Sequence, residues 1–570
     1  MTKFKIQYSK PERIDLSILG KQYQEKNKED YNPFQIENLQ LYNPLYNQFF
    51  TMNKNNYNSV SFNHKYQVVD LNTVQQDTKE RTQREIHIKF SPLLDPYRYM
   101  IGKYNIDDDR LKQMPQFDSN IDTVHPKILT VHNASYVDSF FCFLTSIALN
   151  DYNVPHGLDY YGSYLGLQEK HRLNIADDIE YLRNSEFFNN NIGKYFYIED
   201  SENEKILNPF FSINSSRKNK LKLSIKDCET VFLDCEELPE LLIENKEELS
   251  ELESVYSKTR SSSLSSSSSD SSTSEVNYSS DEIEDENESE KDENELEDDD
   301  DETEDDDETE DDDETEDDED EEIFGYIHNF PVQMICMEKC DGTLDELFVN
   351  EEMDDKAGAS MLMQVVMILL IYQKMFKFTH NDLHTNNIMF VNTDQEYLYY
   401  QFDKKTYKVP TYGKIYKIID FGRGIYRFNE HVFCSDSFAK DGDAATQYNC
   451  EPFFNDNRSR LEPNTSFDLC RLGSSLFDFV TDISDDEESL DDFQKTIKRW
   501  CMDDNGKNIL YKKNGQERYP NFKLYKMIAR TVHKHTPEAQ LEYDIFKQFC
   551  IQEEITETII NIDELPVLFV

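Results

Sequence analysis

The stretch HNDLHTNN at residues 380–387 decides how this chain is interpreted. It follows an almost wholly apolar segment, Gly358 to Lys377, which predicts a long buried helix, and it precedes the strand-like run NNIMFV. Within the stretch, Asp382 is followed five positions later by Asn387. A carboxylate can orient and deprotonate a hydroxyl, and a nearby amide oxygen can be a ligand for Mg²⁺. Asp and Asn are also common turn residues after a helix, which is the simpler alternative.

A second stretch, KIIDFG, places Asp420 at the end of an apolar strand, 38 positions after Asp382. Strands commonly end at a turn that contains Gly, so this stretch gains its meaning from its position after the first. The segment EYLYYQFDKKTYKVPTYG between the two alternates along its length and predicts an additional hairpin.

Together the two stretches resemble the catalytic loop H-R-D-L-x-x-x-N and the metal-binding Asp-Phe-Gly of protein kinases. With SPLLDPYRYMIGKY and NASYVDSFFCFLTS, the chain is most similar to serine/threonine protein kinases encoded by large DNA viruses. The resemblance covers the chain from about Ser59 to Leu167 and from Phe330 to about Val480. It implies an α+β, bilobal protein-kinase-like fold, with a strand-rich N-lobe and a helical C-lobe, and ATP and Mg²⁺ as cofactors.

The resemblance also assigns roles to single residues. It implies that Asp382 is catalytic and that Asn387 and Asp420 hold metal, with structural support from His380, Phe421, Gly422 and Asp468. Asp468 lies in SFDLCRLG, which resembles the helix whose buried Asp accepts hydrogen bonds from the catalytic-loop backbone. It is also consistent with a simple acid at a helix N-terminus.

The ATP-binding residues follow from two strand-like runs. IHIK ends at Lys89 and resembles V-A-I-K, whose Lys contacts the α- and β-phosphates. MICMEKCDG resembles the hinge, with Met337 at the gatekeeper position and the backbone of Glu338 and Cys340 facing adenine. A solvated Lys at the end of a strand and a core strand leaving its sheet are the simpler alternatives.

The chain departs from the kinase pattern in the phosphate-binding region. No glycine occurs between Gly20 and Gly102, so the Gly-rich loop that covers phosphates is missing ahead of Lys89. Asp138 is the only acid in the helical segment Ala134 to Leu149, and its side chain is shorter than the Glu that would pair with this Lys.

Two further departures lie in the catalytic loop. Asn381 replaces the Arg that meets a phosphorylated activation loop, so we expect no activation by phosphorylation of that loop. His384 stands where protein kinases that modify Ser or Thr usually carry Lys. Small-molecule phosphotransferases of the same superfamily are more similar to the HNDLH form.

The acidic residues are concentrated in one segment. The 570 residues include 59 Lys and Arg against 114 Asp and Glu, a net charge of −55, and residues 281–322 alone hold 33 acids and one Lys. Like charges at almost every position repel one another, and little apolar surface offsets the entropy lost on ordering. With the Ser-rich run before it, this segment predicts a long disordered acidic insertion at residues 245–322.

The other expected segments follow from changes in composition. Strand-like runs and one helical segment dominate before the insertion, and helical patterns dominate after the expected hinge. We therefore expect an unassigned N-terminal extension (1–58), the first part of an N-lobe (59–167), an insertion that can be ordered in part (168–244), the acidic insertion (245–322), the last N-lobe strand (323–337), and the hinge with the C-lobe (338–570).

Charge and composition also limit the partners. Outside residues 281–322 the net charge is still −23, which argues against direct nucleic-acid or membrane-surface binding and favours basic proteins as partners.

The ten Cys include no C-x-x-C pair, so we expect reduced thiols and no zinc site. No apolar stretch reaches the ~20 residues that cross a bilayer, and no signal sequence is recognisable. We expect a soluble, intracellular protein, in the host cytoplasm or the virion if it is viral. Its oligomeric state stays open.

The leading hypothesis is ATP-dependent phosphoryl transfer to Ser or Thr hydroxyls of a protein substrate. One alternative keeps the fold and transfers to a small molecule of the amino-alcohol or sugar type. Another is a catalytically silent protein whose acidic tract binds basic proteins. The missing Gly-rich loop favours the silent protein, whereas the presence of Asp382, Asn387 and Asp420 favours catalysis.

Overall fold

A five-stranded antiparallel sheet is built around two 15-residue strands, β8 (Tyr160–Asn174) and β10 (Phe324–Glu338). β7 (Ile86–Pro92) pairs with the other edge of β10, and β2 (Ile36–Gln40) pairs with β8. β9 (Phe196–Ile198) pairs with the first part of β10. Most residues of β10 are buried, which explains its nearly continuous apolar sequence.

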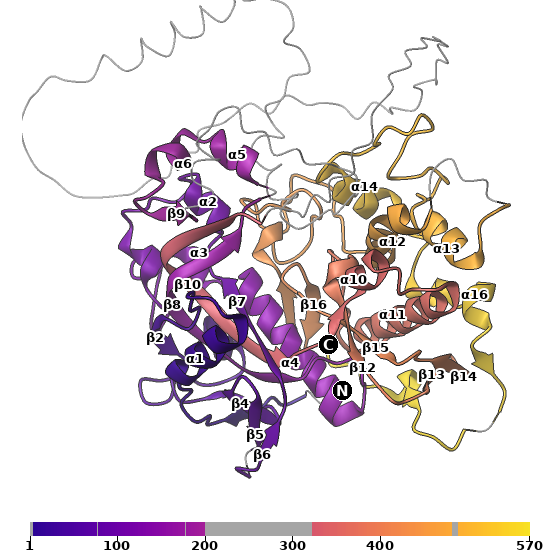
Figure 1. Cartoon of the computed structure of the whole chain (residues 1–570), viewed down its shortest axis with the longest axis horizontal. Coiled ribbons are helices and arrows are strands. Elements are labelled where there is room, and N and C mark those ends of the chain that lie inside the picture. The colour runs from indigo at the N-terminus through magenta and orange to yellow at the C-terminus, as the bar shows by residue number, and fades with distance from the viewer. Residues whose placement is uncertain (1–3, 77, 177, 200–321, 482–487, 554) are drawn as a thin grey trace, which may run out of the picture. The chain divides into compact units, whose positions relative to one another are not determined.

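The structure is a computed structural model that describes residues 4–76, 78–176, 178–199, 322–481, 488–553 and 555–570. These residues belong to one mixed α+β unit (Figure 1). The acidic insertion expected at 245–322 lies outside the described residues, apart from Glu322, and so does the part of the expected 168–244 insertion from residue 200 onward.

The expected boundaries at residues 59 and 168 divide elements that pair in the structure. The segment before residue 59 contains β1 (Tyr8–Ser9), α1 (Leu16–Asn27) and β2, and β2 is hydrogen-bonded to β8. β8 itself continues past residue 168 to Asn174. The N-terminal residues are therefore part of the same sheet as the strands that follow.

A smaller set of elements flanks this sheet. β3 (Ser61–Phe62) pairs with β1, and β4 (Tyr66–Asp70), β5 (Thr73–Gln76) and β6 (Arg81–Gln83) form a three-stranded meander. The helices of this part are α2 (Pro96–Met100), α3 (Pro126–Leu129), α4 (Ala134–Tyr152), α5 (Ile179–Arg183) and α6 (Glu186–Asn191). α4 contains the predicted helical segment, is buried from Ser135 to Ala148, and packs against β8 and β10.

The second part of the chain begins after β10. It contains β11 (Gly342–Thr343), α10 (Leu344–Val349), α11 (Asp355–Phe376), β12 (Ile388–Asn392), β13 (Tyr397–Phe402), β14 (Lys405–Pro410), β15 (Lys414–Ile418), β16 (Ile425–Phe428) and β17 (His431–Cys434). β13 and β14 are the predicted hairpin, and they pair with β19 (Ile560–Asn561) and β18 (Cys550–Ile551) respectively.

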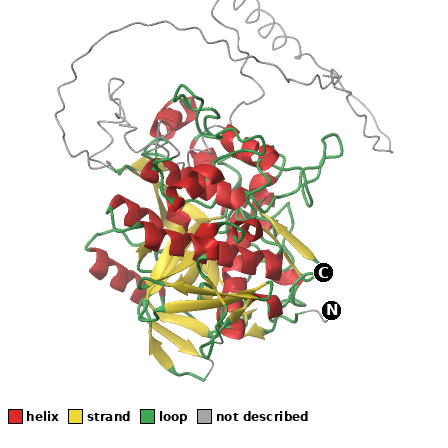
Figure 2. Ribbon diagram, turned by 90° about the vertical axis from the view of Figure 1, so that its right-hand side faces the viewer, coloured by secondary structure: helices red, strands yellow, loops and turns green. Residues whose placement is uncertain are grey.

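Helices dominate the remainder. They are α12 (Phe467–Val480), α13 (Asp492–Trp500), α14 (Lys523–Thr531), α15 (Pro537–Gln540) and α16 (Asp544–Lys547). In Figure 2 the yellow strands gather toward the lower half, and many of the red helices lie above them. The expected α+β class is therefore confirmed. The chain after the expected hinge is less helical than predicted, because strands β11 to β19 lie among helices α10 to α16.

The predicted apolar helix is confirmed as a core helix. α11 is 22 residues long, and by length and composition it could span a membrane. However, 89% of its most apolar window is buried inside the protein. Asp354 caps its N-terminus by accepting a hydrogen bond from the Ala357 N–H, 2.8 Å away. α11 leads directly into the stretch 380–387.

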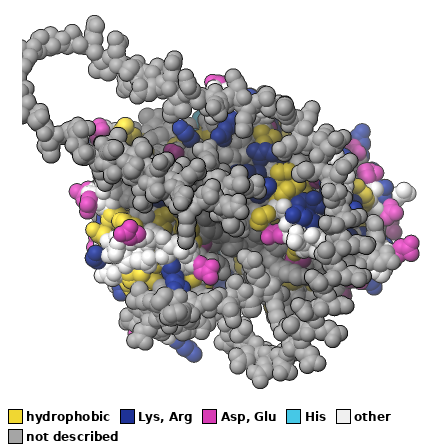
Figure 3. Space-filling view, turned by 90° about the horizontal axis from the view of Figure 1, so that it is seen from above, with side chains coloured by type: hydrophobic (Ala, Val, Ile, Leu, Met, Phe, Trp, Pro, Cys, Tyr) yellow, Lys and Arg dark blue, Asp and Glu magenta, His cyan; other side chains and the backbone are white. Residues whose placement is uncertain are grey.

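The surface of the described part is not uniformly acidic. Figure 3 shows Lys and Arg side chains beside hydrophobic ones on the face seen from above, although the whole chain has a net charge of −55. All eight cysteines that the structure describes are free thiols, as expected.

His156 joins the two parts of the fold. It lies between α4 and β8, where its Nδ1 is 2.7 Å from the Tyr416 carbonyl of β15 and its Nε2 is 2.6 Å from the Tyr400 hydroxyl of β13. The ring is wholly buried, and burial lowers the pKa of His156 to about 4. The neutral ring donates to the carbonyl and accepts from the hydroxyl, so protonation would remove one of these two bonds.

We expect the free energy of unfolding to increase from about pH 4 to about pH 6.5. In this window the unfolded chain protonates His156 at its ordinary pKa of 6.5, whereas the folded protein keeps the ring neutral down to about 4. The unfolded state therefore binds more protons, and stability rises with pH. His156→Gln should reduce the slope of the free energy of unfolding against pH by up to about 1.4 kcal/mol per pH unit. Urea unfolding at several pH values across this range measures that slope. The same change at the half-buried His328 is the control, and equal slopes in both variants would contradict the prediction.

Candidate functional site

A buried ion cluster joins three distant segments of the chain. Lys89 on β7 places its Nζ 2.7 Å from Asp138 Oδ2 on α4 and 2.8 Å from Asp420 Oδ1, just after β15. The Asp138 side chain is 4% exposed, and those of Lys89 and Asp420 are 29% and 27% exposed. Although Asp138 is shorter than Glu, it reaches Lys89 directly. The structure thus brings together the predicted phosphate-binding Lys and one predicted metal ligand.

The charges of this cluster depend on one another. Burial alone would lower the pKa of Lys89, but Asp138 and Asp420 together raise it, so the ammonium stays charged. Burial raises the pKa of Asp138, whereas the nearby Lys89 ammonium outweighs burial and lowers the pKa of Asp420. Two carboxylates share one cation, which leaves an excess of negative charge facing the exposed side of Asp420.

Asp138 also fixes the backbone beside Asp420. Its Oδ1 accepts a hydrogen bond from the Phe421 N–H at 2.9 Å. Asp420 has a left-handed φ of +60°, an uncommon conformation for a residue with a side chain. Phe421 is 1% exposed and packs against Phe141, with the ring centroids 4.7 Å apart. Gly422 donates its N–H to Asp420 Oδ1 at 3.4 Å.

Asp468 on α12 holds the stretch 380–387. Its two carboxylate oxygens accept hydrogen bonds from the backbone N–H groups of His380, at 2.9 Å, and Asn381, at 2.8 Å. Asp468 is wholly buried, and burial raises its pKa. Asn381 has a φ of +65°, so the loop turns sharply just before Asp382. These are the backbone bonds that the sequence resemblance implied for Asp468.

His380 connects this loop to the strand that leads to Asp420. Its Nε2 lies 2.9 Å from the Ile419 carbonyl, and its Nδ1 accepts from the Asp382 N–H at 3.2 Å. The Ile419 N–H in turn donates to the Asn387 carbonyl at 3.0 Å. Ile419, the residue before Asp420, is therefore hydrogen-bonded to both ends of the loop. These bonds bring Asp382, Asn387 and Asp420 to one region.

Asp382 and Asn387 each keep one polar atom without a partner among the described residues. Asp382 is 1% exposed, and while its Oδ1 accepts from the Tyr525 hydroxyl at 2.7 Å, its buried Oδ2 has no hydrogen-bond partner. Asn387 donates through Nδ2 to the Asp382 carbonyl, at 2.9 Å, and to His384 Nε2, at 3.1 Å. Burial lowers the pKa of His384 to about 4, so this ring is a neutral acceptor. The Asn387 Oδ1 accepts no hydrogen bond within the described residues, so it is available as an oxygen ligand.

The expected hinge residues lie at the end of β10. Met337 is 7% exposed and pairs with His87 and Tyr160. Glu338 donates its N–H to the Asp159 carbonyl at 2.9 Å. Cys340 is buried, and its N–H donates no hydrogen bond within the described residues.

The hinge makes no direct bond with the ion cluster. Among the described residues, Met337, Glu338 and Cys340 form no hydrogen bond or ion pair with Lys89 or Asp420. Instead, the Glu338 carboxylate pairs with the buried Lys417 of β15, and Lys417 also donates to the Gly157 carbonyl at 2.6 Å. A bridge thus runs from the hinge to the strand that ends at Asp420.

The segment after Asp420 is held by fixed charges. Asp436 accepts from Lys127 Nζ, at 2.8 Å, and from the Ala134 N–H at the start of α4, at 3.1 Å. Arg423 pairs with Asp443, and the Tyr448 hydroxyl donates to Asn381 Oδ1 at 2.9 Å. Asn381, expected to replace a phosphate-sensing Arg, therefore makes a neutral hydrogen bond to this same segment.

The sequence analysis did not single out Lys417, Asp436, Arg471 or Tyr525. Arg471 gave a signal that could have been used, because it is the only Lys or Arg in FDLCRLGSSLFDFV, a segment in which apolar residues recur at helical spacing. A buried Arg is rare without a paired or functional role. Tyr525 gave none, because it lies 143 positions from Asp382.

The available atoms fit Mg²⁺ together with a nucleotide. Mg²⁺ is usually held by one or two carboxylate or amide oxygens plus phosphates and water, and Asn387 Oδ1 and the Asp420 carboxylate are oxygens of this kind. Among the described residues, no group of three or more His, Cys, Asp or Glu forms a metal site by itself.

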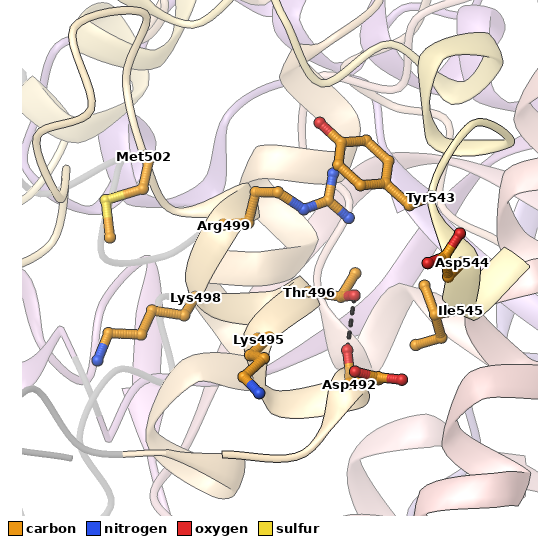
Figure 4. Close-up of a pocket in the computed structure, with 9 residues that line it drawn as sticks. All are labelled: Asp492, Lys495, Thr496, Lys498, Arg499, Met502, Tyr543, Asp544 and Ile545. Carbon is orange, nitrogen blue, oxygen red and sulfur yellow. Dashed lines mark hydrogen bonds between the residues drawn. The ribbon is translucent and has the colours of Figure 1, made fainter. Parts of the chain in front are cut away.

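A separate cavity lies in the helical part (Figure 4). It has a volume of about 370 Å³ and is lined by Asp492, Lys495, Thr496, Lys498, Arg499, Met502, Tyr543, Asp544 and Ile545. The Arg499 guanidinium lies over the Tyr543 ring, 3.3 Å from its centroid. None of the residues predicted to act in phosphoryl transfer lines this cavity.

A comparison with models of known protein families finds no match for this sequence, and a comparison with curated proteins also finds none.

We expect Asp436→Asn to loosen the start of α4. The change removes the charge that pairs with Lys127 and weakens the acceptor of the Ala134 N–H at the start of the helix. It should lower the free energy of unfolding by about 1–3 kcal/mol. Amide hydrogen exchange in the first turn of α4 should become faster, as measured by mass spectrometry. Asp441→Asn removes the same charge at an exposed position of the same segment and should leave that exchange unchanged. Equal exchange in the two variants would show that Asp436 does not hold α4.

Proposed function

We propose that this chain is an ATP-dependent phosphotransferase with a bilobal protein-kinase-like fold, and that it phosphorylates Ser or Thr hydroxyls of protein substrates. The observation that carries the proposal is the convergence of Lys89, Asp138 and Asp420 beside the loop that bears Asp382 and Asn387. Catalysis of phosphoryl transfer is mostly positioning and electrostatic stabilisation. A cation, two oxygen ligands and a general base brought together by rigid elements are the groups that it needs.

In the proposed mechanism Asp382 acts as the general base. Its Oδ2 accepts a hydrogen bond from the acceptor hydroxyl and takes the proton as the hydroxyl oxygen forms its bond to the γ-phosphorus of ATP. The bond between that phosphorus and the bridging oxygen breaks, and ADP leaves with the electron pair. Because Oδ2 has no hydrogen-bond partner within the described residues, it can make this contact without breaking another bond.

The remaining residues bind and orient ATP. Asn387 and Asp420 would hold Mg²⁺, which when bound neutralises charge on the phosphates. Lys89 would contact the α- and β-phosphates while Asp138 keeps its ammonium in place. The Glu338 carbonyl and the Cys340 N–H are suited to the edge of adenine, since the Glu338 N–H already donates to Asp159. Without a Gly-rich loop, phosphate binding depends more on these side chains.

Substitution of the proposed base should separate catalysis from binding. We expect Asp382→Asn to reduce phosphoryl transfer from radiolabelled ATP to a mixture of basic proteins by about 10²–10⁴-fold, with Mg²⁺–ATP binding by calorimetry within about threefold of wild type. Lys89→Met should instead weaken that binding. Asp403→Asn, at the exposed turn between β13 and β14, makes the same chemical change outside the site and should keep wild-type transfer. Normal transfer by Asp382→Asn would refute the mechanism.

Small hydroxyl compounds are a second candidate class of acceptor. The specific observation is that Asp382 is 1% exposed and His384 is a buried neutral ring, so the proposed base offers little open surface to a folded protein. A small amino-alcohol or sugar can enter a more enclosed site than a folded protein can.

ADP formation should be measured with basic proteins, amino-alcohols and sugars as separate acceptors, in wild type and in Asp382→Asn. Transfer to a small alcohol, but not to proteins, that Asp382→Asn abolishes would assign the second class. Transfer to Ser or Thr of proteins alone would assign the first.

A further inference from the structure

A hydroxyl from α14 contacts the proposed base. The Tyr525 hydroxyl donates to Asp382 Oδ1 at 2.7 Å and accepts from Arg471 Nε of α12 at 2.9 Å. Arg471 Nε is itself 3.9 Å from Asp382 Oδ1, and all three side chains are at most 1% exposed. Arg471 therefore acts on Asp382 mainly through the phenol that lies between them.

This arrangement distinguishes the two oxygens of Asp382. Oδ1 is occupied by Tyr525, whereas the buried Oδ2 has no hydrogen-bond partner among the described residues. A carboxylate with one fixed oxygen cannot rotate freely, so the other oxygen keeps its direction. The phenol can hold this orientation because Arg471 fixes its oxygen from the other side.

We infer that Tyr525, held by Arg471, is a positioning residue that aims Oδ2 of Asp382 at the acceptor hydroxyl. The inference rests on the proposed function, because it assigns Tyr525 a part in the same reaction. It concerns the orientation of the base and not the binding of ATP.

The opposite role, in which Tyr525 blocks the acceptor site, is less consistent with its surroundings. Tyr525 is wholly buried, and its ring stacks on Phe522 with the centroids 5.4 Å apart and an interplanar angle of 13°. It also packs against Phe467. A side chain held on several sides is suited to a fixed support. The two roles predict opposite effects on the rate, so one substitution separates them.

The test removes only the hydroxyl. Tyr525→Phe keeps the ring packing, and we expect kcat to fall by about 10–100-fold while the KM for ATP changes by less than about twofold. The selective loss of kcat is the deciding readout, because a loss of packing alone would lower the free energy of unfolding without separating kcat from KM.

The chain contains a matched control. Tyr511 donates its hydroxyl to Asp478, at 3.0 Å and 2.7 Å from the two oxygens, and Asp478 lies on α12, the helix that bears Arg471. Tyr511→Phe therefore deletes a tyrosine–carboxylate bond on the same helix but away from Asp382. It should keep the wild-type kcat and the wild-type KM for ATP.

A second variant is useful if Tyr525→Phe is poorly folded. Replacing residue 525 with 3-fluorotyrosine retains the hydroxyl, and it should keep kcat within about threefold of wild type. Urea unfolding of Tyr525→Phe, Asp382→Asn and the double variant gives a readout that needs no activity. If Tyr525 and Asp382 are in contact, the change in the free energy of unfolding of the double variant should differ from the sum of the changes in the two single variants.

Each outcome supports or overturns the inference. Loss of kcat with an unchanged KM for ATP in Tyr525→Phe but not in Tyr511→Phe supports it. A rate within about twofold of Tyr511→Phe, or a faster rate, overturns it while leaving the proposed function standing. If wild type transfers phosphate to no acceptor, the proposed function fails and the inference fails with it, even where unfolding confirms the contact.

Discussion

The ammonium of Lys89, held between Asp138 and Asp420, is the interaction on which the arrangement of the site depends. It joins β7, α4 and the end of β15, which come from three distant parts of the chain. Asp138 is buried, so removing the Lys89 ammonium would leave its carboxylate without a compensating charge, which is unfavourable. The cluster therefore fixes the position of α4 relative to the segment that follows β15. Its excess negative charge also favours a bound cation.

A second set of bonds fixes the loop that bears Asp382. Asp468 accepts hydrogen bonds from two backbone N–H groups of the loop. The His380 ring is hydrogen-bonded to Ile419, the residue before Asp420. The left-handed conformations of Asn381 and Asp420 cost free energy, and such strain persists where the surroundings determine it. In both places the surrounding bonds come from buried carboxylates, Asp468 and Asp138. The positions of the base and of one proposed metal ligand are thus set together.

The sequence was sufficient to predict secondary-structure elements whose residue pattern is contained in one short segment. α11 and the hairpin of β13 and β14 have patterns that are visible within about twenty residues, and both form as predicted. The pairing of β2 with β8 was missed, because it joins residues more than a hundred positions apart and neither strand alone identifies its partner. For the same reason the sequence could name Lys89 and Asp138 but not the distance between them, and it could not connect Tyr525 to Asp382. Contacts of this kind depend on how whole elements pack, which periodicity does not report.

The distribution of buried cations gives a second observation about the candidate site. The buried Lys and Arg side chains of the described residues are Lys417, Arg423 and Arg471. Each belongs to the region around the candidate site: Lys417 pairs with Glu338 at the expected hinge, Arg423 follows Gly422 and pairs with Asp443, and Arg471 reaches Asp382 through Tyr525. Burying a cation is costly unless it is paired, and hydrophobic residues often stabilise a core at least as well. Stability alone is therefore a weak explanation for three buried cations in one region, and the proposed function gives them a role in controlling the charge of the candidate site.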